Sequence, residues 1–591
     1  MLATALAQYA DERLQDELAD AAFEEKPVAF LLELADDGRF LSLRPRAIAQ
    51  QRGKKQVMIN PPLRVPKSPV NRNSGIHPLL GADDLKYVLG PGAWTKEKEK
   101  ANHEERFAAF VALLARVEES TGDAALKAVT VFYSHPDRVE AAREAAVREG
   151  AIPGQLIALS VDGPIIERDV LRQYWSRHYA TAFSARMQTG ATGMCLISGK
   201  VGPVAPTHDK IKGLGNLGGQ AAGVALMSFD KSAFRSYGWE QNANSPVSPD
   251  RAAAYVLALN HLLRPESKAR RNHGGVAYLF WTRAGQEDTL ISLIENADSR
   301  QVERLLELGR EGLDLKPDDF YFLGVSGNGG RLLVRDWIHD SLDGVLSNVR
   351  RWFSDLQIVD VFTGELATPP PFWKLLQCLC GPGEDDVPAP LSTQLLRRAL
   401  RGQPVKYGLL GRLLTRLRRA QGSERLRPER VALLRLSCNE VLPKGEQMSA
   451  ELNPELESRA YLCGQLLAVY DGLQYEAQKD VNVTVADRFY SLASTHPQLA
   501  FPKIADLGQK HLRKLRRDKR GAMIAIERNI AGLMERIGKD DGKFPGALTL
   551  AEQGSFVLGY HHKKAQSMQQ AQARKQAKQE LPQSGPENTN E

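Results

Sequence analysis

The stretch most able to do chemistry runs from Thr207 to Ser248, and its residue types favour contact with nucleic acid. Its lysines suit phosphates, its glycines let a backbone approach a partner closely, and its side-chain amides suit base edges. The residues are Lys210 and Lys212, the glycines Gly213, Gly215, Gly218, Gly219 and Gly223, and the amides Gln220, Gln241, Asn242 and Asn244. We therefore expect a loop that lies against nucleic acid.

A dinucleotide site is a sharper alternative for the same glycines. Gly213 to Gly218 fits the pattern G-x-G-x-x-G, and Glu240 follows at roughly the required distance. The pattern also requires a buried strand before it, but the residues from His208 to Lys212 are too polar for one. Dinucleotide binding is therefore the weaker hypothesis, and a surface loop without a binding role is the other alternative.

A second polar loop lies between Val65 and Gly90. Its prolines stiffen the backbone while polar side chains project, and no acidic residue occurs from Val65 to Ala82. Alone, this pattern is typical of a solvated loop, but its chemistry resembles that of the glycine-rich stretch. We therefore predict that both loops contact duplex DNA, and the candidates here are Lys67, Asn71, Arg72, Asn73 and Ser74.

The composition is that of a soluble globular protein with more than one domain. The chain has 591 residues, of which 42% are hydrophobic and 25% charged. A net charge of +7 is compatible with a nucleic-acid partner without requiring one. The five cysteines form no C-x-x-C pair, which favours a reduced, cytoplasmic setting, and no apolar run is long enough to span a membrane.

The elements before residue 340 alternate between strands and helices, which predicts an α+β fold. One hairpin is expected from Val28–Leu34 and Arg39–Leu43, and a second from Phe320–Val325 and Arg331–Val334. Ala128–Tyr133 reads as another strand. After this part the strand signals stop, and an all-α basic region and a helical bundle follow. The predicted division is 1–340 (mixed α+β domain), 341–445 (basic helical region), 446–565 (C-terminal helical bundle) and 566–591 (disordered tail).

Two basic runs lie in the helical part. Twelve lysines or arginines stand against two acids from Arg397 to Arg435, and seven against Asp518 from Lys510 to Arg520. A solvated face is the usual meaning of a charge run, but an excess this one-sided favours a polyanion. The candidates for contact with a nucleic-acid backbone are Arg412, Arg416, Arg418, Arg419, Arg513, Lys514, Arg516 and Arg517.

No catalytic pattern is present in the sequence. The chain has no G-x-x-x-x-G-K-[ST] loop, no H-E-x-x-H and no G-x-S-x-G. We therefore predict no catalytic residue, metal ligand or cofactor. A nuclease, or another nucleic-acid-processing enzyme, remains the alternative because distant residues can assemble a site on folding.

Several long stretches carry a family resemblance. The chain resembles the large subunit of the type I-C CRISPR interference complex (Cascade), of the Csd type, over nearly its whole length. The matching stretches include VPKSPVNRNSG, CLISGKVGPVAPTHDKIKGLGNLGGQAAGVALMSFDKSAFRSYGWEQNANSPVS and FVLGYHHKKAQ. The resemblance implies a non-catalytic antiviral protein. Such a subunit recognises the protospacer-adjacent motif in double-stranded DNA, promotes duplex opening, stabilises the displaced strand of the R-loop, and presents the site to a recruited helicase-nuclease.

The resemblance also implies partners. These are target DNA, guide RNA, the backbone and RNA-end-binding Cascade subunits, the helicase-nuclease, and a small subunit made by internal translation. The C-terminal bundle resembles that small subunit. Met448 is the candidate internal start, because it stands in a polar stretch just before the helix expected near Leu456. The alternative is that Met448 is an ordinary linker residue.

Overall fold

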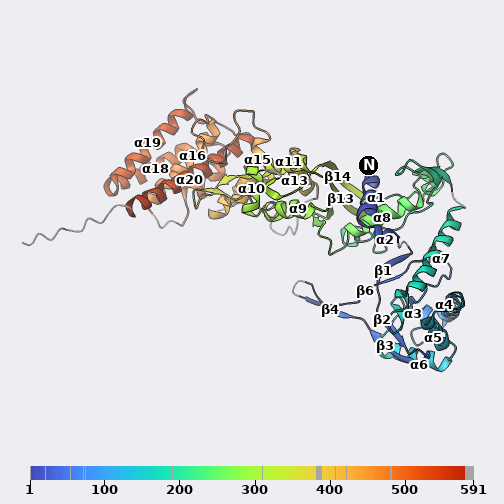
Figure 1. Cartoon of the computed structure of the whole chain (residues 1–591). Coiled ribbons are helices and arrows are strands. Elements are labelled where there is room, and N and C mark those ends of the chain that lie inside the picture. Colours follow the sequence, from blue (N-terminus) through green and yellow to red (C-terminus); the bar gives the residue numbers. More distant parts are fainter. Residues whose placement is uncertain are drawn as a thin grey trace, which may run out of the picture. The chain divides into compact units, whose positions relative to one another are not determined.

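The structure is a computed structural model with helices and small sheets in the N-terminal half and helices in the C-terminal half (Figure 1). It describes residues 2–19, 22–52, 55–70, 72, 75–188, 191–308, 311–380, 389–405, 408–420, 422–478 and 482–579. The predicted fold class is confirmed. The chain forms two compact units: the first holds residues 1–211 and 225–261, and the second holds 212–224 and 262–591. The division at residues 340 and 445 stays a prediction.

The first unit is built on a four-stranded sheet in the order β3-β2-β8-β7. β2 pairs antiparallel with β3 and parallel with β8. The hairpin predicted from the sequence is confirmed, and Gly38 makes its turn at a φ of 75°. The strands are β2 (Phe30–Leu34), β3 (Phe40–Pro45), β7 (Ala82–Asp84) and β8 (Leu156–Val161).

The predicted strand Ala128–Tyr133 is wrong, because these residues belong to helix α5 (Ala124–Tyr133). Asp123 caps this helix by accepting a hydrogen bond from the backbone N–H of Leu126. The buried residues of α5 recur at helical rather than alternating spacing, and they are Ala125, Leu126, Ala128, Val129 and Phe132. The β-branched and aromatic composition of the run had favoured a strand, but the cap and the burial of one face decide for a helix.

Helices and two-stranded ribbons complete the first unit. Its helices are α1 (Leu2–Arg13), α2 (Gln15–Ala19), α3 (Leu85–Val88), α4 (Lys100–Thr121), α6 (Pro136–Arg148), α7 (Asp169–Gln188) and α8 (Pro249–Leu262). Its ribbons pair β1 (Phe23–Pro27) with β6 (Pro62–Pro66), β4 (Ile48–Arg52) with β5 (Lys55–Ile59), and β9 (Thr192–Met194) with β10 (Val201–Pro203). The proline-containing loop leaves from β6 and the glycine-rich stretch follows β10, so the two ribbons anchor the two predicted DNA-contacting loops.

The second unit begins with an antiparallel sheet in the order β11-β12-β13-β14. The second predicted hairpin is confirmed, although its strands are longer than expected. One face of the sheet, with Tyr278, Phe280, Phe320 and Phe322, joins the hydrophobic core. The strands are β11 (Arg270–His273), β12 (Val276–Thr282), β13 (Asp319–Asn328) and β14 (Arg331–Ser341).

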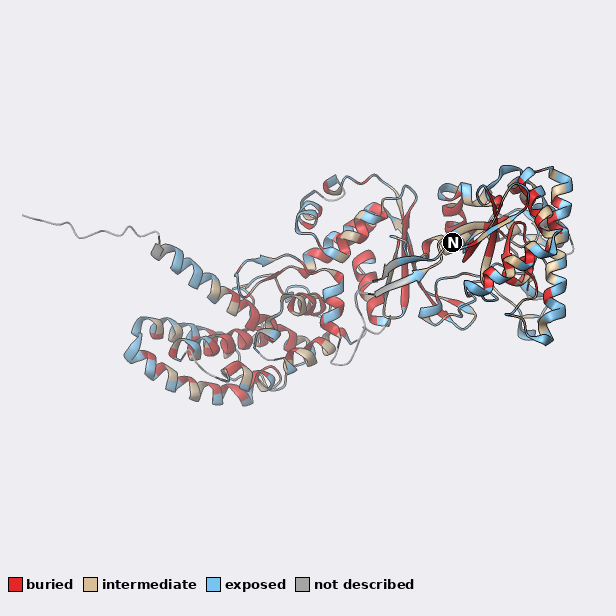
Figure 2. Ribbon diagram, turned by 90° about the horizontal axis from the view of Figure 1, so that it is seen from below, coloured by how far each residue is buried: buried red, intermediate tan, exposed pale blue. Residues whose placement is uncertain are grey.

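A continuous hydrophobic core joins this sheet to the helices that follow it. Buried residues lie on the inner faces of these helices and exposed residues on their outer faces (Figure 2). A short ribbon, β15 (Ile358–Val359) with β16 (Leu366–Ala367), also belongs here. The helices are α9 (Glu287–Asn296), α10 (Ser299–Leu308), α11 (Leu342–Leu356), α12 (Phe372–Leu379), α13 (Ala389–Arg401), α14 (Leu409–Arg419), α15 (Pro428–Asn439), α16 (Arg459–Ala477), α17 (Val485–Ala493), α18 (Pro497–Asp518), α19 (Arg520–Ile537) and α20 (Leu550–Gln579).

The last helix runs into the segment for which a disordered tail is expected. α20 continues to Gln579, and its extension is held by hydrogen bonds from Gln569 to the carbonyl of Gly364 and from Gln572 to the carbonyl of Phe362. Residues 580–591 lie outside the described residues. In the part of the chain that the structure describes, no helix combines the length and hydropathy needed to cross a membrane.

Candidate nucleic-acid interface

The glycine-rich stretch does not form the single loop expected from the sequence. Residues 207–211 and 225–248 belong to the first unit, whereas residues 212–224 belong to the second. Lys210 and Lys212, separated by one residue, therefore belong to different units, and both are exposed. Among the exposed candidates, Lys210 and Gln241 consequently belong to the first unit, and Lys212 and Gln220 to the second.

The glycines of the second unit pack against the turn of the β13–β14 hairpin. Gln220 donates its backbone N–H to the carbonyl of Gly329 at 3.0 Å, and Gly329 donates in turn to the carbonyl of Gly218 at 3.0 Å. A Cβ on Gly327 would clash with the backbone of Gly219, so only glycine permits this approach. The glycine signal therefore reflects, at least here, close contact between two backbone segments rather than contact with nucleic acid.

The geometry required for dinucleotide binding is absent from this segment. Within residues 212–224, all of which the structure describes, the one helical element is the 3₁₀ turn η3 (Gly215–Leu217). A phosphate-binding glycine loop needs a strand before it and a full helix after it. The strand and the helix that a dinucleotide site requires are thus both missing from residues 212–224.

The predicted base-reading amides differ in their availability. Asn242 is only 2% exposed, and Asn244 donates its side-chain amide to the carbonyls of Phe234 at 2.9 Å and Gln241 at 3.3 Å. Asn242 is therefore withdrawn from the surface, whereas Asn244 stabilises the local conformation of the first unit. The side chains of Gln241 in the first unit and Gln220 in the second are exposed, so these two amides are the ones able to reach a base edge.

Lys67 links the proline-containing loop to the glycine-rich stretch within the first unit. Its Nζ lies 2.5 Å from Oδ2 of Asp209, 142 residues away in sequence. Burial alone would lower the pKa of the Lys67 ammonium, but the Asp209 carboxylate outweighs this effect and the pKa is raised. Lys67 of the proline-containing loop and Asp209 of the glycine-rich stretch are therefore neighbours, and Lys67 is paired with an acid. Asn71, Asn73 and Ser74 lie outside the described residues.

Arg72 holds a buried carboxylate. It donates to both oxygens of Asp83 at 2.7 and 3.0 Å, and its guanidinium lies 4.6 Å from the ring centre of Tyr87. Burial raises the pKa of Asp83, whereas Arg72 and the backbone N–H groups of Leu79 and Asp84 act to lower it. Arg72 thus has a structural role, because without it Asp83 would be a buried carboxylate without a counter-ion.

Most arginines of the first basic run are used inside the second unit. Arg412 donates to the carbonyl of Leu379 at 2.8 Å, and Arg416 donates to that of Cys378 at 3.2 Å. Arg418 donates to the side chain of Gln553 on α20 at 2.9 Å, whereas Arg419 is exposed. These three arginines connect helices within the second unit, and contact of the run with a nucleic-acid backbone stays a prediction.

Several acidic partners of the arginines in the first basic run lie outside residues 397–435, so they were absent from the count of charges in that run. Arg397 forms a bidentate ion pair with Asp336, in which each of the two hydrogen bonds is 2.7 Å long. Arg398 donates to the carboxylates of Asp355 and Glu440. Arg435 donates to four backbone carbonyls, those of Ser354, Asp355, Gln357 and Met448. Buried guanidinium groups need such partners, and they account for much of the local charge excess.

The second basic run remains exposed on α18. Arg513, Lys514, Arg516 and Arg517 all lie at the surface. Arg516 is 3.9 Å from Glu527, and within the described part of the chain no ion pair involves the other three. Lys503, Lys510, Lys514 and Arg517 recur at helical spacing along one face of α18. Asp506 is exposed on the same face between Lys503 and Lys510, so the part of this face without an acid is that of Lys510, Lys514 and Arg517.

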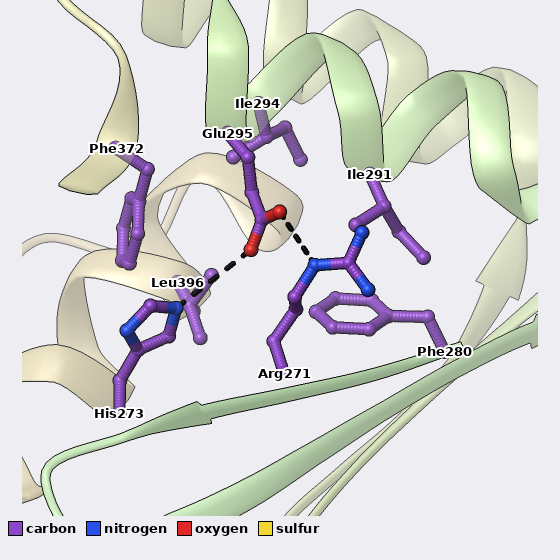
Figure 3. A pocket seen from close by; sticks show the side chains of 8 residues that line it. All are labelled: Arg271, His273, Phe280, Ile291, Ile294, Glu295, Phe372 and Leu396. Carbon is purple, nitrogen blue, oxygen red and sulfur yellow. Dashed lines mark hydrogen bonds and ion pairs between the residues drawn. The ribbon is translucent and has the colours of Figure 1, made fainter. Parts of the chain in front are cut away.

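A larger and more open polar pocket in the first unit, of about 360 Å³, is lined by Ser198, Lys200, Val201, Gly202, Ser248, Asp250 and Arg251. A small, mainly apolar cavity lies beside β11 in the second unit (Figure 3). Glu295 lies between Arg271, at 2.5 Å, and His273, at 3.8 Å. Burial would raise the pKa of Glu295, but the neighbouring His273 and Arg271 lower it. The cavity volume is about 10 Å³, room for about one water molecule and not for a nucleotide. Among the described residues, no group of three or more His, Cys, Asp or Glu side chains is placed to hold a metal ion.

Two exposed aromatic residues were not singled out from the sequence. Tyr237 is 86% exposed and Trp239 is 51% exposed, and both lie in the first unit between two of the candidate amides. The sequence could have indicated them, because the two aromatic residues stand in a polar, glycine-containing segment. No helical or alternating pattern of apolar residues surrounds them, so burial in a core was not predicted.

Comparison with known proteins gives one family. A family model described as CRISPR-associated protein (Cas_Csd1) matches residues 6–568. No curated protein matches the chain.

Proposed function

Because the chain belongs to the Cas_Csd1 family of CRISPR-associated proteins, we propose that it is the non-catalytic large subunit of a type I-C CRISPR surveillance complex. In this role it recognises the protospacer-adjacent motif in duplex DNA, promotes opening, stabilises the R-loop and presents the target to a helicase-nuclease. Guide RNA pairing supplies the remaining specificity. The family match over residues 6–568 is the observation that carries the proposal.

The motif-reading role rests on side chains that remain available. Lys210 and Gln241 are exposed on the first unit, and Gln220 is exposed on the second. An exposed amide offers both a donor and an acceptor to a base edge, whereas a lysine contributes mainly through phosphates. In this proposal the amides discriminate between motifs and Lys210 supplies affinity without specificity.

The strand-holding role rests on α18. Its basic face carries Lys510, Lys514 and Arg517 without an acidic partner among the described residues. Such a face binds a nucleic-acid backbone irrespective of sequence and with strong salt dependence. We therefore assign the displaced strand to α18 rather than to Arg412, Arg416 and Arg418.

The internal start at Met448 is part of the same proposal. In the full chain Met448 is buried, and its backbone N–H donates to the side chain of Asn439 at 2.7 Å. A separate product beginning there contains α16 to α20 but lacks α14 and α15. In the full chain, Gln553 of α20 accepts a hydrogen bond from Arg418 of α14, and Gly554 packs on Cys438 of α15. Without α14 and α15, this surface of α20 is exposed. We therefore expect another chain of the complex to bind the small subunit at this surface of α20.

Binding and cleavage experiments on the purified full chain test the proposal. We expect it to bind duplex DNA and to leave the DNA uncut in the presence of Mg²⁺ or Mn²⁺. Lys210→Ala should weaken binding to all targets alike and lower the salt slope by about one. Lys98→Ala is the matched control, because Lys98 is also exposed on the first unit but lies outside both predicted loops. Metal-dependent cleavage would instead favour the nuclease alternative.

A further inference from the structure

An aromatic pair projects from the surface of the first unit. The rings of Tyr237 and Trp239 lie 6.2 Å apart and are inclined at 49° to each other. The exposed fractions are 86% for Tyr237 and 51% for Trp239. Much of both rings is therefore accessible to a partner.

The loop beneath the pair is hydrogen-bonded rather than loose. It begins with the 3₁₀ turn η4 (Ser232–Phe234), whose Phe234 ring packs edge-on against Phe229 at 5.5 Å. Asn244 donates to the carbonyl of Phe234 at 2.9 Å. Gly238 donates to the carbonyl of Arg235 at 2.9 Å and has a φ of 74°, which reverses the backbone between the two rings. One aromatic ring therefore anchors the loop while two remain at its surface.

The surroundings of the pair suit nucleic acid better than an apolar protein face. Lys231 and Arg235 are exposed in the same loop, which also carries the exposed acids Asp230 and Glu240, and among the described residues Lys231 makes no ion pair. Arg235 is 3.9 Å from Glu240, an exposed and weak pair. A protein-binding core needs contiguous apolar neighbours, whereas single-stranded nucleic acid needs ring faces with cations nearby.

We propose that Tyr237 and Trp239 form a stacking platform for unpaired bases of the target DNA next to the motif. This inference rests on the proposed function. It adds that these two side chains contact the opened, single-stranded part of the target rather than the duplex. The inclination of the rings does not allow them to enclose one base between them, so each ring takes the face of a different base or the end of a base stack.

The test uses the assembled complex and target DNA with 2-aminopurine at successive positions beside the motif. Binding by the wild type should quench the probe at one or two unpaired positions. Tyr237→Ala and Trp239→Ala should restore its fluorescence and weaken binding to pre-opened DNA about tenfold, without changing the salt slope. Tyr237→Phe and Trp239→Phe keep the rings and should retain most of the quenching.

Two further variants separate stacking from other losses. Trp373→Ala removes a comparably exposed ring in the second unit and should have no effect on the probe. Lys231→Gln should lower the salt slope while the probe stays quenched. If the alanine variants bind and quench as the wild type does, the platform is wrong while motif recognition stands. If they lose complex assembly instead, the rings bind a protein subunit. A wild-type complex that binds no DNA would overturn the proposed function as well.

Discussion

Helices α16 and α20 meet through two glycines, and replacing one of them gives a sharp test of the bundle. A Cβ on Gly464 of α16 would clash with the carbonyl oxygen of Phe556 on α20. Reciprocally, a Cβ on Gly559 of α20 would clash with the carbonyl oxygen of Tyr461. Both obstacles are helix backbone, which cannot rotate away as a side chain can, so Gly464→Ala must push the helices apart.

The magnitude follows from two opposing terms. Alanine in a helix interior is favoured over glycine by about 1 kcal/mol. Overpacking in a well-packed core costs ~1–3 kcal/mol, and a clash with backbone belongs at the upper end. The net free-energy loss for Gly464→Ala is therefore about 2 kcal/mol. Gly472→Ala in the same helix is the matched control, because nothing lies within 4 Å of its added Cβ, and we expect it to stabilise the helix by about 1 kcal/mol.

Hydrogen exchange in the full chain measures both effects where they act. For Gly464→Ala we expect the slowest amides of α16 and α20 to exchange about thirtyfold faster than in the wild type. For Gly472→Ala we expect exchange in α16 to be unchanged or slower. Wild-type protection in Gly464→Ala, or equal loss of protection in both variants, would refute the close helix contact.

Three other predictions concern the second unit. His561 is buried, and burial lowers its pKa in the folded chain from 6.5 to about 4. As the pH falls, the imidazole is therefore protonated in the unfolded chain at a higher pH than in the folded chain. The associated stability is complete above about pH 6.5 and falls by about 3 kcal/mol as the pH drops to about 4, and His561→Gln should flatten this part of the pH profile of denaturant unfolding. Charge reversal at Lys514 and Arg517 should shorten the lifetime of the opened DNA complex in a dissociation assay while leaving motif choice intact; a change in motif choice would place α18 at the motif instead. With a C-terminal tag on the gene, Met448→Leu should abolish a second, smaller tagged band, and a band that persists would locate the start elsewhere.

Local chemistry was enough to predict several elements of the fold. The hairpin of β2 and β3 follows from Asp37-Gly38 between two apolar runs, and Gly38 adopts the positive φ that this turn requires. The error at α5 arose because its β-branched residues resemble a strand, while the information that decides for a helix lies in the Asp123 cap and in tertiary burial.

The candidate site was less predictable because it depends on partners distant in sequence. The residue-type pattern indicated two polar loops, but it held no information on the pairing of Lys67 with Asp209. Counting charges in a window likewise could not show that Arg397 meets Asp336 or that Arg418 meets Gln553. The exposed face of α18 was predictable because its basic residues are consecutive on one helix and have few acids nearby.

The central claim is that this chain reads a short DNA motif as part of a guide-RNA complex. The most direct measurement is to co-purify the chain with a guide RNA and its neighbouring subunits, and to select bound duplexes from a library with randomised sequence flanking the guide-matched segment. We predict enrichment of one short motif on one side of the target, retained by Lys210→Ala at lower overall affinity and weakened by Gln241→Ala. Equal recovery of all flanking sequences by the wild-type complex would contradict the claim.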